Sequence, residues 1–575
     1  MSGARSRPPE PDRIAPLPGV PPCAASAQNA CFSPFVPLPK RDLQASPSLR
    51  RAVRAIKVSP LALAAWLGAG EAAAQGNYQS APIGGRSSIM GGTGVALGID
   101  GAAPFLNPAT LSRIEDKRLA FSSRFFAYFR RSFDDWQAPG AIDPTRVGDL
   151  QIEPQSQSEQ YLAILPDAAC FFLDWVSRKK AAANKDRLYR APVAQATAGS
   201  GKLGGCIART EVSTFALNAL NFAVNTASGR VNQTQTIGRL WTSWSGGPSF
   251  AYSINEDFSV GAAFYGIQNL YISHATVTSL VGGSGDLLPS SIAYHTAMEA
   301  ESWDALAHVG LSYRLNEALT VGLSVRSPSI HIQDRVRASY SEFQDGSGSQ
   351  TRYWAGSGSY DASSPARVAV GLGAEWDRLR LEINGFLYMG LKELARVEMI
   401  REGVLIKPGL DPVRSLARVV LTEEAAPVAN VGVGSEFFLT SDLSLLTGFL
   451  TDFSALAPLS ETEPYASRIY HERMNGVHGG VGVTSYTDYG DLMIGLRGSY
   501  VWGETSAVNT FVSPARLEAV DTRGFSAVVV VAGRVSPGTM KEAAKDVGDA
   551  VKGNAAAPGD KPKEPMRNPL KKEIQ

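Results

Sequence analysis

The residues that most often carry chemistry form no recognisable catalytic pattern in this chain of 575 residues. No two histidines lie at the helical spacing with which a pair of side chains ligates one metal ion. The run Gly92-Thr93-Gly94 lacks the Lys-Ser/Thr that completes a phosphate-binding loop, and no Gly-x-Ser-x-Gly nucleophile elbow occurs. We therefore predict that the protein is not an enzyme and binds no metal and no cofactor. The six histidines are His274, His295, His308, His331, His471 and His478.

Two of the four cysteines have the positions of a structural pair. Cys23 and Cys31 lie near the start of the chain, in a stretch that we expect to be lost on export. Cys170 and Cys206 remain in a chain exported to an oxidising compartment, where thiols can pair. We favour a disulfide between Cys170 and Cys206 over two free thiols in a loop, because the bond would restrict a long insertion between them.

The overall composition is rich in glycine, with 56 of them, and poor in charged residues, at 19%. This profile excludes wholesale disorder. The formal net charge is +1, with 55 basic against 54 acidic residues, so no overall field favours nucleic acid as a partner. No stretch offers the ~18 consecutive apolar residues of a transmembrane helix. Insertion into a membrane must therefore use strands.

The N-terminal part of the chain resembles a secretion signal. Basic residues between positions 50 and 57 precede a short apolar run at 60–66 and a small-residue cleavage site. The apolar run is too short to span a bilayer, which takes roughly 20 residues. We predict a signal peptide at 50–74 with cleavage after Ala74. Residues 1–49 show no periodic pattern, and we interpret them as an unstructured leader or an over-extended gene start.

Period-two alternation dominates the chain from about residue 118 onward. In residues 319–326, Leu and Val side chains alternate with Thr, Gly, Ser and Arg, and residues 303–314 and 366–376 repeat the pattern. A strand with this pattern places aliphatic groups on one face and polar or small groups on the other. Segments of roughly ten such residues, separated by turns, are typical of a transmembrane β-barrel, although a soluble sandwich would also alternate.

The connections distinguish the barrel from the sandwich. A barrel inserted from the periplasm has short turns on one side and long loops on the other. Short turns rich in turn-forming residues are predicted at 255–257, 316–318, 376–378, 440–442 and 489–491. Long loops are predicted at every second connection, at 270–299, 330–362, 390–426, 455–473 and 503–522.

We therefore predict an all-β fold, a transmembrane antiparallel β-barrel of about fourteen strands covering residues 118–535. Residues 165–206 fit this scheme poorly, since they fall on the short-turn side. They are either a periplasmic insertion or the sign of one misplaced hairpin. The Lys-rich residues 536–575 are predicted to form a flexible periplasmic tail. The strands are expected to begin near residues 118, 157, 207, 247, 258, 302, 319, 365, 379, 428, 443, 476, 492 and 525.

Residues 75–117 are predicted to form an N-terminal plug. The stretch 84–98 is too rich in glycine to build a core of its own, so its apolar side chains need an enclosure, and a barrel lumen provides one. Asn107-Pro108-Ala109 places Asn at an N-cap and Pro at the first helical position, which predicts a short helix. The plug motif consists of Gly91, Gly92, Gly94, Asn107, Pro108 and Ala109.

These residues resemble the opening of the FadL/TodX (OmpP1) family of outer-membrane transporters for long-chain fatty acids and aromatic hydrocarbons. The resemblance rests on the run Met90-Gly91-Gly92-Thr93-Gly94-Val95-Ala96 and on Asn107-Pro108-Ala109, and we judge it to cover residues 81–535. The insertion at 165–206, the Lys-rich tail and Thr110 after Ala109 depart from the family pattern. They affect the expected substrate more than the expected fold.

The resemblance implies passive uptake of a hydrophobic compound through the outer membrane of a Gram-negative bacterium. The expected partners are hydrophobic small molecules and outer-membrane lipid, and the protein is expected to be a monomer. Two alternatives stay open: a plugged barrel that acts as a structural or secretion-shuttle protein, and a water-filled porin, which the plug disfavours. Inward-facing polar candidates on the strands are His308, Arg314, Arg326, Arg380, Glu382 and Glu436.

Overall fold

The computed structural model describes the plug region and the strands of the barrel. The described residues are 76–79, 83–114, 118–133, 155–161, 165–176, 198–226, 229–281, 290–345, 349–458, 463–464, 469–470, 472–487, 490–509 and 516–535. The predicted leader, the signal peptide with its cleavage site, and the tail lie outside these residues. No helix among the described residues combines the length and apolar character needed to cross a bilayer.

Within the described residues, twenty strands follow three short helices. The helices are α2 (Gly85–Ile89), α3 (Ala103–Leu106) and the 3-10 helix η2 (Pro108–Arg113). The strands are β1 (Arg118–Phe133), β2 (Gln155–Tyr161), β3 (Leu165–Val176), β4 (Gly201–Thr226), β5 (Gly229–Ser253), β6 (Phe258–Val281), β7 (Ser290–Arg314), β8 (Leu319–Arg326), β9 (Ile330–Asp345), β10 (Gln350–Ala362), β11 (Arg367–Glu375), β12 (Leu379–Tyr388), β13 (Leu391–Ile406), β14 (Val413–Ala425), β15 (Val428–Phe438), β16 (Leu443–Asp452), β17 (Glu463–Pro464), β18 (Glu472–Thr487), β19 (Gly490–Asn509) and β20 (Arg516–Val535).

The strands close into one antiparallel barrel. Neighbouring strands pair in sequence order, and β20 pairs with β1 over most of both strands, which joins the two ends of the sheet. In five places, two consecutive strands lie end to end and together form one strand of the wall. These are β2 with β3, β8 with β9, β10 with β11, β12 with β13, and β14 with β15. Counted in this way and without the two-residue β17, the wall has fourteen strands, which confirms the predicted fold class.

Side chains alternate between the two faces of the wall, as β7 illustrates. Trp303, Val309 and Tyr313 are exposed on the outer face, whereas Asp304 and His308 are buried inside. The outer apolar stretch of β7 begins and ends with an aromatic residue, as expected where a wall meets the two interfaces of a bilayer. A closed antiparallel barrel with an apolar outer band is the architecture of bacterial outer-membrane proteins.

Most residues predicted as long loops belong to strands instead. β6 continues to Val281, and β7 begins at Ser290. The ranges 330–362 and 390–426 consist largely of β9, β10, β13 and β14. The prediction was wrong because strands that extend beyond the apolar band have water on their outer face, so the apolar half of the alternation is lost. β9, for example, is exposed or half-buried at most positions.

The predicted insertion at 165–206 was too long, and it hid parts of two wall strands. Residues 165–176 form β3, and β4 begins at Gly201. β3 ends at Val176 and β4 begins at Gly201 at the end of the barrel that carries the short turn 254–257, because Val176 and Tyr252 both pair with Gly201. The Lys-rich stretch of the 177–200 connection lies outside the described residues. The hairpin was therefore not misplaced, and the insertion is confined to this connection.

The pairing of the wall is interrupted between the β8/β9 strand and the β10/β11 strand. It ends at the pair Arg326 and Arg367, and it resumes at the pair Val336 and Gly358. Between these points the backbone N–H of Ser329 donates to the Ser364 carbonyl over 3.0 Å. Residues 327–335 and 359–366 do not form a ladder with each other, although 330–335 pair with β7 and 359–362 pair with β13 on their other edges. We refer to these two stretches as the unpaired wall segment.

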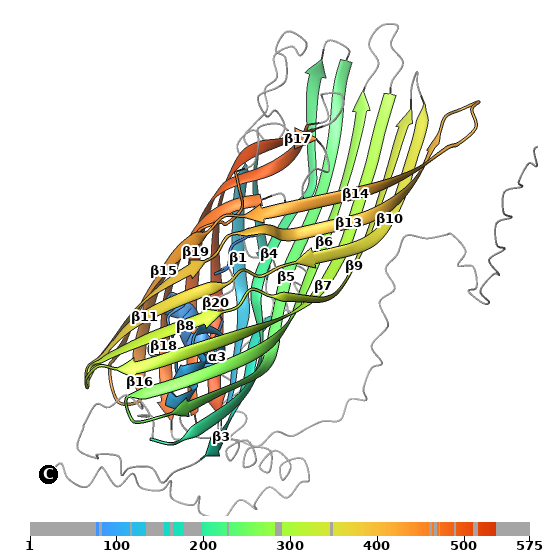
Figure 1. Ribbon diagram of the computed structural model, residues 1–575. Coiled ribbons are helices and arrows are strands. Elements are labelled where there is room, and N and C mark those ends of the chain that lie inside the picture. The colour runs from blue at the N-terminus through green and yellow to red at the C-terminus, as the bar shows by residue number, and fades with distance from the viewer. Residues whose placement is uncertain are drawn as a thin grey trace, which may run out of the picture. The chain divides into compact units, whose positions relative to one another are not determined.

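The three short helices lie inside the ring of strands (Figure 1). Every described residue of α2 and α3 is buried, and η2 contacts β5, β6 and β7. Asn107 caps η2, since its side chain accepts a hydrogen bond from the Ala109 N–H. The residues predicted to form a plug therefore occupy the lumen, and their helix begins at the predicted Asn-Pro-Ala.

Candidate functional site

The plug meets the wall through backbone at its first glycine turn. Gly91 has a φ of +66°, and a Cβ atom there would lie 2.2 Å from the Phe449 carbonyl oxygen. The facing wall positions also lack side chains. A Cβ on Gly448 would lie 2.3 Å from the Met90 carbonyl carbon, and one on Gly480 would lie 2.4 Å from the Ile89 carbonyl oxygen. Glycine on both partners is thus required for this contact.

Glu382 on β12 holds the next part of the plug. Its carboxylate accepts three backbone N–H groups, from Gly94 at 2.9 Å, Ala96 at 2.8 Å and Leu97 at 3.3 Å. Glu382 is 1% exposed, so these bonds form away from water. A carboxylate surrounded by backbone donors stabilises a loop that has no regular hydrogen bonding of its own.

Glu436 on β15 joins the plug to the wall by charge. Its Oε2 lies 2.7 Å from Arg86 Nη2 of the plug and 3.2 Å from Arg380 Nη1 of β12. Ser444 and Tyr486 donate to the other oxygen. Burial lowers the pKa of Arg86, but the Glu436 carboxylate and Tyr486 raise it above its ordinary value, so the guanidinium stays charged. Arg380, Glu382 and Glu436 therefore all serve to seat the plug.

Asn107 fixes the far end of the plug. Its Nδ2 donates to the Val95 carbonyl at 2.7 Å within the plug and to the Leu311 carbonyl at 2.8 Å on β7. Pro108 lies against two wall glycines, because a Cβ on Gly261 or Gly310 would fall within 3.0 Å of it. The Asn-Pro motif thus combines a helix cap with a docking contact.

The remaining inward candidates have different surroundings. His308 is buried, with Nδ1 3.2 Å from the Pro104 carbonyl of the plug. Arg314 lies at the end of β7 and pairs with Asp257 in the 254–257 turn, so it belongs to the rim, and it forms no hydrogen bond or ion pair with the described residues of the plug. Arg326 is the last residue of β8, directly before the unpaired wall segment, and its Nη2 donates to the Pro365 carbonyl at 3.4 Å.

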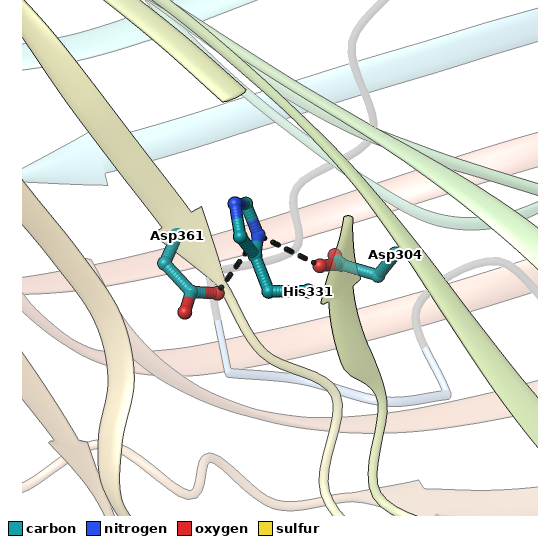
Figure 2. A group of neighbouring side chains, drawn as sticks. All are labelled: Asp304, His331 and Asp361. Carbon is teal, nitrogen blue, oxygen red and sulfur yellow. Dashed lines mark hydrogen bonds and ion pairs between the residues drawn. The ribbon is translucent and has the colours of Figure 1, made fainter. Parts of the chain in front are cut away.

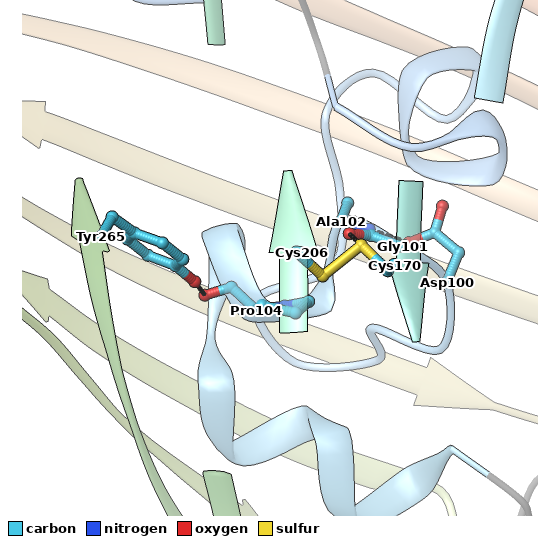
Figure 3. Close-up of a disulfide and its surroundings, with 7 residues drawn as sticks. All are labelled: Asp100, Gly101, Ala102, Pro104, Cys170, Cys206 and Tyr265. Atoms are coloured by element: carbon cyan, nitrogen blue, oxygen red, sulfur yellow. Dashed lines mark hydrogen bonds between the residues drawn. A yellow bond between two sulfur atoms is a disulfide. The ribbon is translucent and has the colours of Figure 1, made fainter. Parts of the chain in front are cut away.

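A disulfide joins Cys170 on β3 to Cys206 on β4, directly behind the plug (Figure 3). The two cysteines are opposite each other in the register of these strands. A Cβ on Gly101 of the plug would lie 3.6 Å from the Cys170 sulfur. The bond closes the 177–200 connection at its base and forms part of the surface on which the plug rests.

A cavity remains between the plug and the wall. Its volume is about 50 Å³, and it is partly open to solvent. Among the described residues, neither Arg326 nor Arg367 forms an ion pair there, and Arg367 donates to the Phe105 carbonyl at 2.7 Å. The aromatic and apolar lining of the cavity could not be predicted from the sequence, because its members come from three strands and the plug. The apolar and aromatic lining residues are Tyr78, Ile83, Phe105, Leu106, Tyr265, Leu306 and Tyr388.

Comparisons with known proteins return structures of outer-membrane channels. No family model matches the chain, and no curated protein matches it. A FadL homologue of Pseudomonas aeruginosa is 13% identical and covers 81% of this chain and 100% of its own, with a TM-score of 0.46. The toluene transporter TodX of Pseudomonas putida is 13% identical over 82% and 99%, with a TM-score of 0.46. The toluene transporter TbuX of Ralstonia pickettii is 15% identical over 79% and 99%, with a TM-score of 0.40.

These solved structures include members of the family that the plug residues resemble. The fold assigned to this chain rests on its own strand pairing and on the closure between β1 and β20.

Proposed function

We propose that the protein is an outer-membrane channel for the passive uptake of hydrophobic compounds, with the N-terminal plug as its gate. The observation that carries this proposal is the cavity between plug and wall, which combines an aromatic lining with a plug held by hydrogen bonds and ion pairs. An apolar solute gains free energy on entering such a lining from water. Because the contacts of the plug are non-covalent, the plug can shift to let the solute pass.

The two arginines of the cavity favour a hydrophobic compound that carries a carboxylate. Arg326 and Arg367 direct hydrogen bonds to backbone carbonyls, and their guanidinium carbons lie 5.9 and 6.0 Å from the ring centres of Tyr388 and Phe386. A carboxylate bound there would gain charge-assisted hydrogen bonds while its apolar chain contacts Phe105 and Tyr265. A long-chain fatty acid fits this chemistry better than an uncharged aromatic hydrocarbon.

Uptake measurements test both the transport of hydrophobic compounds and the role of the plug as a gate. Radiolabelled oleate and radiolabelled toluene would be supplied to cells with the gene, without it, and with a variant that lacks residues 84–109. We expect uptake to depend on the gene and to become leaky in the plug deletion. If neither compound depends on the gene while surface proteins are lost from the knockout, the channel proposal fails and the secretion-shuttle alternative replaces it.

The Arg326→Gln variant tests the preference for a carboxylate. Arg326 forms no hydrogen bond or ion pair with the described residues of the plug, so its loss should leave the gate seated. We expect oleate uptake to fall about tenfold, since a hydrogen bond to a charged group contributes about 1.5–3 kcal/mol, while any toluene uptake is unchanged. Arg314→Gln at the rim is the matched control and should have no effect. Equal losses for both compounds would exclude a specific role for Arg326 in binding the carboxylate.

A further inference from the structure

Three side chains from three different wall strands converge on one point at the edge of the unpaired wall segment (Figure 2). They are Asp304 on β7, His331 on β9 and Asp361 on β10. His331 Nδ1 lies 3.2 Å from Asp304 Oδ1 and 3.5 Å from Asp361 Oδ1. All three ligand-type atoms lie within 4.8 Å of one another.

The two separations from His331 Nδ1 to the carboxylate oxygens match those of ligands around a small divalent cation. With bonds of 2.0–2.2 Å, two ligands of a tetrahedral zinc ion lie about 3.3–3.5 Å apart. A proton on Nδ1 of His331 would stabilise the two carboxylates less well than a cation, because a single N–H cannot point at both carboxylate oxygens at once. A cation between the three atoms would be bound by all of them and would offset the two negative charges, one of which, on Asp304, is completely buried.

A second set of polar groups orients the three ligands. The other ring nitrogen of His331, Nε2, lies 3.3 Å from Asp334 Oδ2. The same oxygen accepts a hydrogen bond of 3.0 Å from the Tyr360 backbone N–H. A carboxylate on the far nitrogen of a histidine is the usual partner of a metal-bound imidazole, since it fixes the ring and its tautomer.

Asp304 is oriented in the same way. Its second oxygen, Oδ2, accepts a hydrogen bond of 2.7 Å from Asn269 and lies 3.4 Å from the Ser302 hydroxyl. Oδ1 therefore remains directed at His331. Asn269 and Ser302, which orient Asp304, are buried, and Asp334, which orients His331, is half-buried.

We propose that Asp304, His331 and Asp361 form a binding site for a divalent transition-metal ion, with Zn²⁺ as the best fit to one imidazole and two carboxylates. The side chains of His331 and Asp361 are 31% and 40% exposed, which gives the ion a route of entry and leaves room for a water ligand. The ion joins Asp361 of β10 to His331 of β9. It thereby links the two strands across the stretch in which their backbones do not pair.

Zinc binding to the purified full-length protein tests this site. The protein would carry a tag without histidine, be extracted in detergent, stripped with a chelator and titrated with Zn²⁺, Mn²⁺ and Ca²⁺ by calorimetry. We expect one Zn²⁺ per chain and much weaker binding of Ca²⁺, since an imidazole ligand disfavours calcium. His331→Gln and Asp361→Asn should each weaken Zn²⁺ binding at least tenfold.

His295→Gln is the matched control, because His295 lies on the same wall, is exposed and contacts only Thr276 among the described side chains. Hydrogen exchange of the unpaired wall segment adds a second readout, and exchange there should slow when Zn²⁺ is bound. Each variant is first checked for folding by its heat-dependent migration on a gel. Folded wild type that binds no Zn²⁺ stoichiometrically, or binding that survives in His331→Gln, would overturn the proposal. Neither result depends on what the channel transports.

Discussion

Arg86 of the plug and Glu436 of the wall form an ion pair of 2.7 Å in which both side chains are buried. The two residues are 350 positions apart in the sequence. The same carboxylate contacts Arg380, which also pairs with Glu375, so Glu436 is shared by two guanidinium groups in the lumen. Loss of the carboxylate would leave both cations without their shared partner.

The variant Glu436→Gln should therefore release the start of the plug. Breaking a buried pair by removing one partner costs about 3–5 kcal/mol. We expect trypsin to cleave after Arg86 in folded Glu436→Gln protein and not in wild type, as detected by mass spectrometry of the products. Asp257→Asn breaks the exposed pair with Arg314 at the rim and should leave Arg86 protected, because exposed pairs contribute little. Protection of Arg86 in Glu436→Gln would show that the pair does not hold the plug.

The variant Glu382→Ala should loosen the middle of the plug. It removes the acceptor of three buried N–H groups, and each unsatisfied donor costs about 1–3 kcal/mol. We expect a higher ion conductance per channel in planar bilayers than for wild type. Asn384→Ala, at the next inward position of β12, is the control, since the Asn384 side chain has no hydrogen-bond partner among the described residues. Equal conductance of the two variants would contradict the role given to Glu382.

Gly91→Ala and Gly92→Ala form a pair that separates backbone strain from contact with the wall. Both residues have positive φ, +66° and +70°, so both variants carry the same strain. A Cβ at Gly91 would lie 2.2 Å from the Phe449 oxygen, whereas the nearest atom to a Cβ at Gly92 is 3.5 Å away. We expect only Gly91→Ala to make cells more sensitive to large antibiotics that the outer membrane excludes. Equal sensitivity would mean that the close contact at Gly91 is unimportant.

Reduction or removal of the disulfide should lower the stability of the barrel only moderately. The bond between Cys170 and Cys206 closes a loop with a sequence separation of 36, for which loss of a disulfide costs about 2–4 kcal/mol. We expect the double variant Cys170→Ser/Cys206→Ser to insert and to unfold at a lower temperature or urea concentration than wild type. Labelling of free thiols in unfolded, unreduced wild type checks the bond itself, and two labelled cysteines would refute it.

Alternation in the sequence predicted the wall strands within the bilayer and their inward residues. Glu382 and Glu436 follow from this pattern, because a strand that is apolar on its outer face places every second residue inside. Their partners in the plug do not follow from it. The loop at 94–97 has no period, so the three N–H groups that Glu382 accepts are set by the path of the plug through the lumen.

The position of His331 illustrates a second limit. Arg326 pairs with His308, and continuing that register would place His331 opposite Trp303 on the outer face. The interruption at 327–329 shifts the register by one residue, so His331 lies opposite Asp304 inside the barrel. The search for metal ligands at helical spacing also missed these residues, which are 27 positions apart on neighbouring strands. A single β-bulge thus decides whether the three residues meet.

The seat of residues 89–91 on Gly434, Gly448 and Gly480 has a consequence for the speed of the gating that we propose. Where two surfaces meet through backbone alone, no rotamers have to be frozen each time they meet and none have to be released each time they part. The ion pair and the carboxylate around this seat set how strongly the plug is held. In the proposed channel, the bare glycine surface would allow the plug to return to the same position quickly after each passage, without a slow rearrangement of the lining.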